Sequence, residues 1–314
     1  MIKVKLSWKE GMEIMSEAET MKKYSFVVIA DTQIISRNHP EHFEKMVDWI
    51  VKSKQQEQIQ FVLHVGDVCD NGADDEQQFQ LAGAQLKRIV EAGLPLIAVP
   101  GNHDYDNWLE INRDLTMYNR YLGVEFYKDQ SWFGGVFEQG KSENMYALLD
   151  IGEDRYIVLA LEFGPRKAVM EWAEQILQQH ADRQAVILTH SFLYIDGERT
   201  REGDNHHPRD YKGIGEACDG EEMWQHYLKR HKNVFAVFSG HHVPGNAAVR
   251  IDQGDGGNQV IQSFQNWQMK EEGGQGRVRL VTIDKTAGEC LLQVYNPVAG
   301  KYEDGPGYNM VIPL

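Results

Sequence analysis

The stretch IQFVLHVGDVCD, residues 59 to 70, joins an apolar run to a Gly-Asp pair and a second aspartate three residues later. Such a run predicts a buried β-strand, because a strand covered on both faces needs apolar side chains in succession. Two more runs end similarly, YSFVVIAD at 24 to 31 and PLIAVPGNHD at 95 to 104. Between the three runs, apolar residues at three- and four-residue spacing predict helices at about 41–54 and 76–92. This alternation indicates an α/β fold.

Five predicted strands end in side chains that suit a metal ion: Asp31, Asp67, Asn102, His190 and His241. Ligand sites in open α/β sheets lie at the carboxyl ends of parallel strands, so we expect these side chains to meet in one crevice. Each has an ordinary alternative, because a strand-ending Asp or Asn is commonly a turn or cap residue and a lone His is commonly a core residue. Their joint occurrence favours a single site.

The rest of the sequence predicts more strands within a single domain. Strand-like runs are MYALLDI, RYIVLAL, QAVILTH and NVFAVFSGHH, with helices near 166–180 and 219–231. We expect residues 1–20 to be an N-terminal extension and 21–314 to form one domain, with C-terminal strands at about 247–314 completing its second sheet. The expected architecture is a four-layer α-β-β-α sandwich of two mixed sheets flanked by helices, with the metal site at the carboxyl ends of the strands.

The charge balance restricts the possible partners. The chain of 314 residues has a formal net charge of −15, which disfavours long nucleic acid because proteins that neutralise many phosphates normally carry a basic stripe. Three widely spaced cysteines fit a reducing compartment better than a disulfide framework. The N-terminus lacks the apolar core of a signal peptide, and no apolar run is long enough to span a bilayer. We therefore expect a cytoplasmic protein without a membrane partner, while its oligomeric state stays open.

The order of the strand-ending residues resembles the calcineurin-like metallophosphoesterase family. Its signature is D-x-H, G-D-x-x-D, G-N-H-D, a His after a strand, and G-H-x-H. This sequence has DTQ at 31–33, GDVCD at 66–70, GNHD at 101–104, TH at 189–190 and GHHV at 240–243. The first and last motifs each depart by one residue, because Gln33 and Val243 stand where the family has histidines. The DTQ form, together with LEFGPR at 161–166, resembles a subfamily with D-x-Q.

The resemblance implies a role for each matching residue. It makes Asp67 the carboxylate that bridges two cations and places Asp31 and Gln33 at the first cation. The second cation takes three further ligands, Asn102, His190 and His241. The implied cofactors are one or two divalent transition-metal ions, with Mn, Fe and Zn as the leading candidates. We expect the first site to bind weakly, because it lacks two imidazoles. His242 is displaced by one position from a ligand and is interpreted as a structural or substrate-side residue.

The resemblance also implies a reaction. His103 would protonate the leaving oxygen or steady the transition state, and Asp70 would hold its ring. With a metal-bound hydroxide attacking phosphorus, the chain would be a metal-dependent phosphoric ester hydrolase acting on a phosphodiester or a small organic phosphate. Two alternatives stay open: a catalytically impaired scaffold of the same fold that binds proteins, and a nuclease on short or single-stranded nucleic acid. Tyr105 and Trp108 either stack on a base or pack within a surface loop, and Arg166 is either a phosphate contact or an exposed turn residue.

Overall fold

The computed structural model describes residues 21–314, so the predicted extension at residues 1–20 lies outside the described part of the chain. The first sheet contains the predicted β-α-β-α-β series: β1 (Lys23–Ile29), α3 (Pro40–Ser53), β2 (Ile59–His64), α4 (Glu76–Glu91) and β3 (Leu96–Ala98). A short helix, α2 (Gln33–Asn38), precedes α3. β1 pairs in parallel with β2, and β2 with β3, so their carboxyl ends lie at the same edge.

The second sheet is built by the second half of the chain. Its strands are β4 (Phe133–Val136), β5 (Met145–Ile151), β6 (Asp154–Ala160), β7 (Gln184–Leu188), β8 (Val234–Ser239), β9 (Asn246–Gln253) and β10 (Gln259–Asn266). They are ordered β4-β5-β6-β7-β8-β10-β9 across the sheet. Because β6, β7, β8 and β10 pair in parallel, this sheet also gathers several carboxyl ends at one edge.

The C-terminal strands divide between the two sheets, which differs from our prediction that they complete the second one. Only β9 and β10 join the second sheet. β11 (Val278–Asp284) pairs antiparallel with β1, and β12 (Glu289–Asn296), β13 (Lys301–Glu303) and β14 (Met310–Pro313) extend the first sheet from there. The physical reason is that β1 is apolar along most of its length and would otherwise form an unpaired edge.

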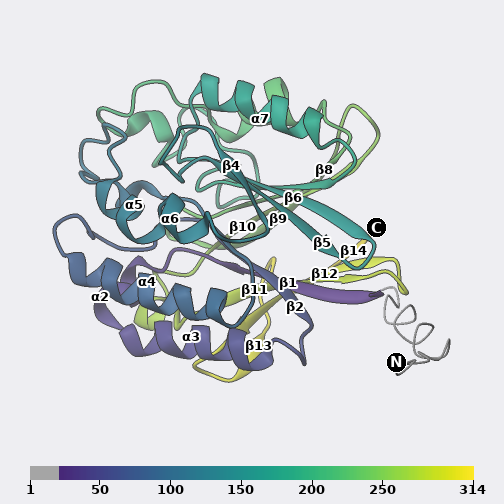
Figure 1. The fold of residues 1–314 in the computed structure, drawn as a ribbon, viewed down its shortest axis with the longest axis horizontal. Helices are drawn as coiled ribbons and strands as arrows, with labels where there is room; N and C mark the ends of the chain where they lie inside the picture. Colours follow the sequence, from purple (N-terminus) through teal and green to yellow (C-terminus); the bar gives the residue numbers. More distant parts are fainter. Residues whose placement is uncertain (1–20) are drawn as a thin grey trace, which may run out of the picture.

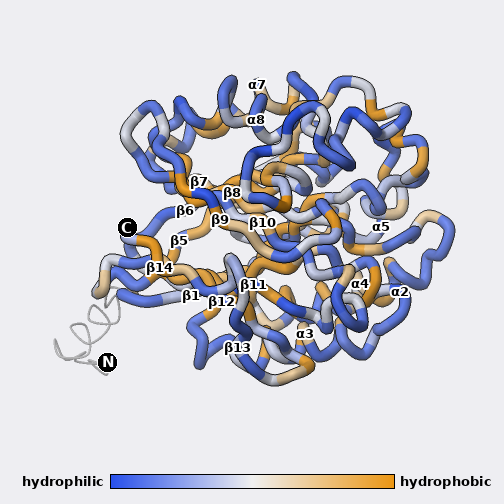
Figure 2. Tube along the Cα trace, turned by 180° about the vertical axis from the view of Figure 1, so that it is seen from behind, coloured by the Kyte–Doolittle hydropathy of each residue, from blue (hydrophilic) through white to orange (hydrophobic). Residues whose placement is uncertain are grey.

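The two sheets pack face to face between two layers of helices (Figure 1), which confirms the predicted α-β-β-α sandwich. Alternate residues of β1 serve different layers, because Tyr24, Phe26 and Val28 join the core between the sheets, whereas Val27 and Ile29 pack with α3 and α4. A third core lies between the second sheet and α7 (Lys167–Gln179). Figure 2 shows hydrophobic segments mainly along the strands in the middle of the molecule.

Some short elements differ from the sequence-based expectation. The helix expected at 219–231 is α8 (Gly220–Met223) followed by a π-helical turn at Trp224–Leu228. We did not predict α5 (Thr116–Leu122), α6 (Val124–Tyr127) or β4, which are too short for a strong periodic signal. Within residues 21–314, the structure contains no helix long and apolar enough to cross a membrane.

Candidate metal centre

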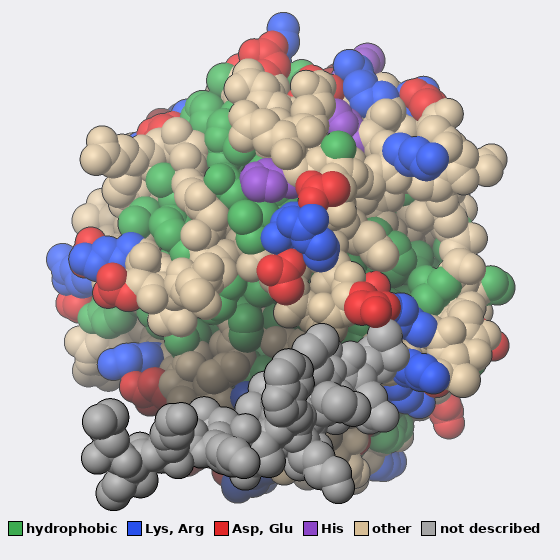
Figure 3. All heavy atoms as spheres, turned by 45° about the vertical axis from the view of Figure 1, so that its right-hand side comes forward, with side chains coloured by type: hydrophobic (Ala, Val, Ile, Leu, Met, Phe, Trp, Pro, Cys, Tyr) green, Lys and Arg blue, Asp and Glu red, His purple; other side chains and the backbone are tan. Residues whose placement is uncertain are grey.

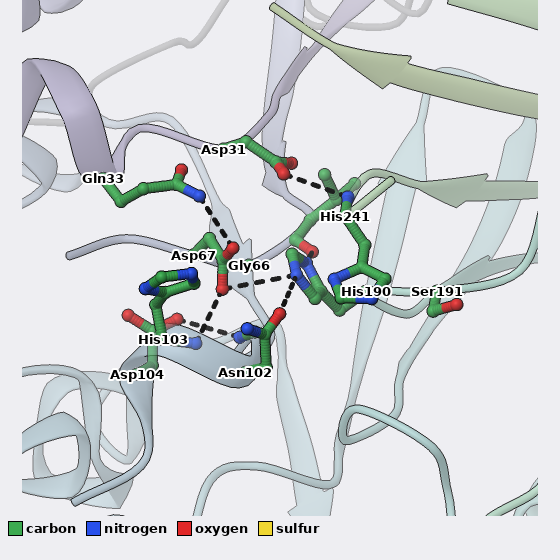
Figure 4. Close-up of polar contacts among 12 residues, drawn as sticks. Asp31, Gln33, Gly66, Asp67, Asn102, His103, Asp104, His190, Ser191 and His241 are labelled. Atoms are coloured by element: carbon green, nitrogen blue, oxygen red, sulfur yellow. Dashed lines mark hydrogen bonds and ion pairs between the residues drawn. The ribbon is translucent and has the colours of Figure 1, made fainter. Parts of the chain in front are cut away.

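The five strand-ending residues singled out in the sequence come together at one edge of the sandwich (Figure 4). Asp31, Asp67 and Asn102 follow β1, β2 and β3, while His190 and His241 follow β7 and β8. One ligand atom each from Asp67, His190 and His241 lies within 4.8 Å of the others. The parallel strands of both sheets therefore place their carboxyl ends around a common point.

The backbone around this point is held in unusual conformations. Asp31, Asp67 and His241 have left-handed φ angles of 48°, 53° and 79°, which side-chain-bearing residues seldom adopt. Two glycines let the carboxylates approach the neighbouring loops. A Cβ on Gly240 would lie 2.1 Å from Asp31 Oδ1, and one on Gly101 would lie 2.1 Å from Asp67 Oδ1. Strained positions of this kind cluster at functional sites.

His190 presents one nitrogen to two oxygens. Its Nδ1 lies 2.7 Å from the Val65 carbonyl and donates a hydrogen bond to it. Its Nε2 then faces Asp67 Oδ1 and Asn102 Oδ1, each at 3.3 Å. Burial lowers the pKa of His190, but the negative charge of Asp67 outweighs this and raises the pKa to about 9. A proton on Nε2 or a bound metal ion would satisfy the three atoms together.

His241 is oriented as a fourth donor. Its Nε2 donates to the carbonyl of His206 at 2.8 Å, which leaves Nδ1 as the nitrogen with a lone pair for a ligand. Its backbone N–H donates to Asp31 Oδ2 at 3.0 Å. Burial, reinforced by the neighbouring His242 and His190, lowers the pKa of His241 well below its usual range. A neutral imidazole is the form that binds a metal ion.

The other side of Asp67 offers a smaller set of donors. Gln33 donates from Nε2 to Asp67 Oδ2 at 2.8 Å. Its Oε1 and the Oδ1 of Asp31 are both buried and have no hydrogen-bond partner among the described residues. Unpaired buried acceptors are costly, and each of these oxygens is of a type that can bind a cation. The residues present therefore fit a first metal site with fewer ligands than the second. This agrees with the sequence, in which Gln33 and Val243 stand where the family signature has histidines.

His103 lies beside this group, and Asp70 contacts its ring through both the backbone carbonyl and the carboxylate. Nδ1 lies 2.8 Å from the backbone carbonyl of Asp70 and 3.5 Å from the Asp70 carboxylate. That carboxylate is engaged by Arg37 at 2.6 Å, so the shorter contact to the histidine is the carbonyl. The indole of Trp108 stacks on the imidazole at a centroid distance of 5.1 Å. The ring is therefore fixed from two sides.

The comparison with known families decides the identity of the fold. The family model for calcineurin-like phosphoesterases matches residues 24–245. The chain belongs to the calcineurin-like phosphoesterase family. This confirms the family expected from the motifs, and members of the family use divalent metal ions. The D-x-Q subfamily stays a prediction.

One curated relative and two solved structures show how far the likeness extends. This chain is 27% identical over 281 residues to the uncharacterized protein YvnB of Bacillus subtilis (strain 168), a match that covers 87% of this chain and 20% of YvnB. The chain thus spans about a fifth of that relative's length. A purple acid phosphatase from yellow lupin (Lupinus luteus) seeds aligns with a TM-score of 0.56 at 15% identity, covering 94% of this chain and 54% of that chain. A dimetal phosphatase from Danio rerio aligns with a TM-score of 0.58 at 12% identity, covering 92% and 98%. At these identities the structures show the shared fold.

Two buried residues that we did not single out hold the motif loops of the chain together. The Asp104 carboxylate accepts hydrogen bonds from the backbone N–H groups of Val68, Cys69 and Gly101, at 2.8 to 3.1 Å. His64 lies 3.0 Å from Thr32 Oγ1, and its Nδ1 accepts from a backbone N–H two residues later. These bonds tie the loops after β1, β2 and β3 to one another.

Asn266 is a third residue that we did not predict. It ends β10, and its Nδ2 donates to Asp31 Oδ2 at 2.7 Å and to the His241 carbonyl at 3.1 Å. The sequence signal that marked the other site residues also applies to Asn266, because it is a polar residue that ends a buried strand, and this strand is parallel to β8. It was missed because its strand lies in the C-terminal region, outside the motifs.

Asn266→Ala is expected to lower the affinity for a divalent ion by about ten- to a hundredfold, the usual effect of removing a group that orients metal ligands. The substitution removes the donor that positions the Asp31 carboxylate and the loop of His241. Titration with Mn²⁺ by calorimetry measures the change. An affinity equal to that of the unchanged chain would show that Asn266 does not orient the ligands.

Three other residues that we considered for substrate binding are instead buried or engaged by other side chains of the protein. Tyr105 is buried with 1% exposure and belongs to the core cluster that includes residues of α4, so of the two alternatives it packs in the interior and does not present its ring to a base. Arg166 is held by Glu162 at 2.8 Å and Glu138 at 2.9 Å, so carboxylates occupy its guanidinium. His242 is fully buried, with Nε2 3.0 Å from Ser191 Oγ, which fits the structural role.

A cavity of about 810 Å³ lies at the amino ends of the second sheet, far along the strands from the metal centre. Its lining includes Asp154, Asp182, Arg183, Lys232 and Lys285, and none of the predicted site residues. On the face shown in Figure 3, acidic and basic side chains are likewise interspersed. This distribution differs from the basic stripe that long nucleic acid requires.

Proposed function

We propose that this phosphoesterase hydrolyses a phosphodiester or a small organic phosphate with divalent metal ions held at the centre around Asp67. The observation that carries the proposal is the position of His190 Nε2, 3.3 Å from both Asp67 Oδ1 and Asn102 Oδ1. Because Nδ1 donates to the Val65 carbonyl, a neutral ring directs its lone pair at two oxygens. Such an arrangement is stable around a cation, and the family membership favours a metal ion.

The donor set supports one or two ions, with Mn, Fe and Zn as candidates. Asn102, His190 and His241 would hold the second ion, and Asp31 and Gln33 the first, with Asp67 between them. The mixture of carboxylate, amide and imidazole donors suits these metals. When bound, the ions supply positive charge for the phosphate oxygens and lower the pKa of a water molecule that attacks phosphorus.

His103 is proposed to serve the leaving group. Its Nδ1 donates to the Asp70 carbonyl, so Nε2 is the nitrogen available to the departing oxygen, and it donates a proton there when the ring is in its imidazolium form. The side chain is 23% exposed, which gives a substrate access to it. Trp108 keeps the ring plane fixed through stacking, so the proton at Nε2 is held in one direction.

Hydrolysis of bis-p-nitrophenyl phosphate and p-nitrophenyl phosphate, each with and without a chelator, tests the proposed function. We expect chelator-sensitive turnover of at least one of the two, and their ratio shows whether a diester or a monoester is preferred. Turnover that is indifferent to chelation would contradict a metal-dependent reaction. Cleavage of short single-stranded oligonucleotides in the same assay would place the nuclease alternative first.

A non-catalytic scaffold is the second candidate, and the observation that favours it is the poorer donor set on one side of Asp67. Gln33 and Val243 stand where the family signature has histidines, and this side of Asp67 offers the described donors Asp31 and Gln33. A protein that has lost one ion can keep the fold while losing the reaction. The His103→Ala variant considered in the Discussion separates the two functions.

Gln33→His is expected to tighten binding at the first site, because imidazole nitrogen binds transition-metal ions more strongly than an amide oxygen does. Gln33 is fully buried beside Asp67, so the new ring would face the same carboxylate. The number of Mn²⁺ ions bound per chain, measured at limiting free metal, reports the change. An occupancy that does not rise would mean that another group already completes that shell.

A further inference from the structure

We propose that His39, Glu41 and His42 form a second metal site, separate from the centre at Asp67, that takes Zn²⁺. We call this group the junction site, because it lies where α2 ends and α3 begins (Figure 1). One ligand atom from each of the three residues lies within 4.8 Å of the others. Glu41 Oε1 lies 3.6 Å from His39 Nδ1 and 3.9 Å from His42 Nδ1.

These separations suit tetrahedral zinc. With metal–ligand distances near 2.0 Å, tetrahedral ligand atoms lie about 3.3 Å apart. The two separations from Glu41 exceed this by about 0.3 and 0.6 Å, and the two histidine nitrogens lie within 4.8 Å of each other, so side-chain rotations would bring the three ligand atoms together around an ion. Two imidazoles and one carboxylate are a ligand set that zinc uses when its fourth position is left for water.

The orientation of His42 is the independent observation that points to a ligand. The residue is 6% exposed, and its buried Nδ1 has no hydrogen-bond partner within residues 21–314. Its Nε2 lies 2.9 Å from Glu272 Oε2 and donates its proton there. The lone pair of Nδ1 is thereby directed toward Glu41. A carboxylate that fixes the far nitrogen of a histidine is the usual support of a metal-binding imidazole.

His39 completes the group from the connection between the helices. It occupies the position before Pro40, the first residue of α3, and its side chain lies over the first turn of that helix. The His39 and His42 rings stack at 5.3 Å with an interplanar angle of 14°. Because His39 is 30% and Glu41 57% exposed in their side chains, an ion can enter from solvent. The helix dipole opposes a cation at this end, and the charges of Glu41 and Glu272 offset it.

Such an ion would fasten three segments of the first sheet's helical layer. It joins the end of α2 to the start of α3, and through His42 to the loop of Glu272, which packs on α2. α2 begins at Gln33, whose amide contacts Asp67. The zinc ion would thereby hold the helix that leads away from the centre at Asp67, with water at its fourth position.

Zinc content per chain tests the proposal in untagged, full-length protein that carries Asp67→Asn to empty the catalytic centre. After saturation with Zn²⁺ and desalting, we expect one equivalent in the Asp67→Asn chain and none after adding His42→Gln. Adding His226→Gln, which changes an exposed histidine away from the group, is the matched control and should keep the equivalent. Bound Co²⁺ should show the visible absorption of a tetrahedral ion in the same samples.

If the variant with the buried His42 replaced does not fold, His39→Gln provides the same test, because His39 is partly exposed and its replacement disturbs the core less. Equal zinc content with and without the histidine substitutions, in folded protein, overturns the junction site. In the otherwise unchanged chain, His39→Gln should lose one equivalent of zinc while phosphodiester turnover persists. Because zinc content is measured without a substrate, failure of the proposed function leaves this result interpretable.

Discussion

Asp67→Asn is expected to remove the divalent ions from the catalytic centre and to lower phosphodiester turnover by about a thousandfold or more. Asp67 Oδ1 faces His190 and accepts from the His103 backbone N–H, while Oδ2 accepts from Gln33. Asparagine keeps the size and one acceptor oxygen but removes the negative charge that attracts cations. Mn²⁺ bound per chain and turnover of bis-p-nitrophenyl phosphate measure the two effects.

Asp74→Asn is the matched control for this substitution. Asp74 lies a few residues further along the same loop, and its side chain is exposed, so the control removes one negative charge at the surface. Its Mn²⁺ content and turnover should equal those of the unchanged chain. A folded Asp67→Asn variant with undiminished Mn²⁺ content would show that Asp67 is not at the centre of the site.

His103→Ala is expected to lower turnover by about a hundred- to ten-thousandfold while the metal content stays constant. The contact between residue 103 and Asp67 runs through the backbone N–H at 2.9 Å, so alanine preserves it. What is lost is the imidazole between Trp108 and the Asp70 carbonyl. Steady-state kinetics and metal analysis of the same preparation separate the loss of a proton donor from the loss of an ion.

His226→Ala provides the comparison, because this histidine is exposed and distant in the chain, and it should keep full turnover. If His103→Ala hydrolyses the diester as fast as the unchanged chain, His103 takes no part in the reaction. If the unchanged chain has no turnover and both variants keep their ions, the result favours the scaffold function over the phosphoesterase function.

The strands that carry the site were predictable because their signals are local. β1 and β2 are continuous apolar runs that end at once in Asp31 and Gly66-Asp67. Burial on both faces leaves such a run no other regular structure of that length. Since parallel strands share an edge, the meeting of their end residues followed from the α/β pattern alone.

The allocation of the C-terminal strands was not predictable in the same way. β11 lies beside β1 although more than 250 residues separate Tyr24 from its partner Ile283. β10 instead joins β8 in the second sheet. The alternating patterns of β11 and β10 fit either sheet, because strand pairing at this separation leaves no local trace in the sequence.

The ligand types were predictable, but the contacts that orient them were not. Backbone carbonyls hold three of the histidines: Val65 for His190, His206 for His241 and Asp70 for His103. A carbonyl has no signature in the amino-acid sequence, since every residue carries one. The same limit applies to Asp70, whose backbone carbonyl makes the shorter contact to His103 while Arg37 binds one oxygen of its carboxylate.

The central claim, that this chain hydrolyses phosphoesters with metal ions around Asp67, is tested most directly by metal reconstitution. The measurement is hydrolysis of bis-p-nitrophenyl phosphate by chelator-stripped protein with Mn²⁺, Fe²⁺, Zn²⁺, Co²⁺, Ni²⁺ or Mg²⁺ added back singly. We expect no turnover in the stripped protein and restored turnover with Mn²⁺, Fe²⁺ or Zn²⁺. Absence of turnover with every ion, in protein that stays folded and binds them, would contradict the claim.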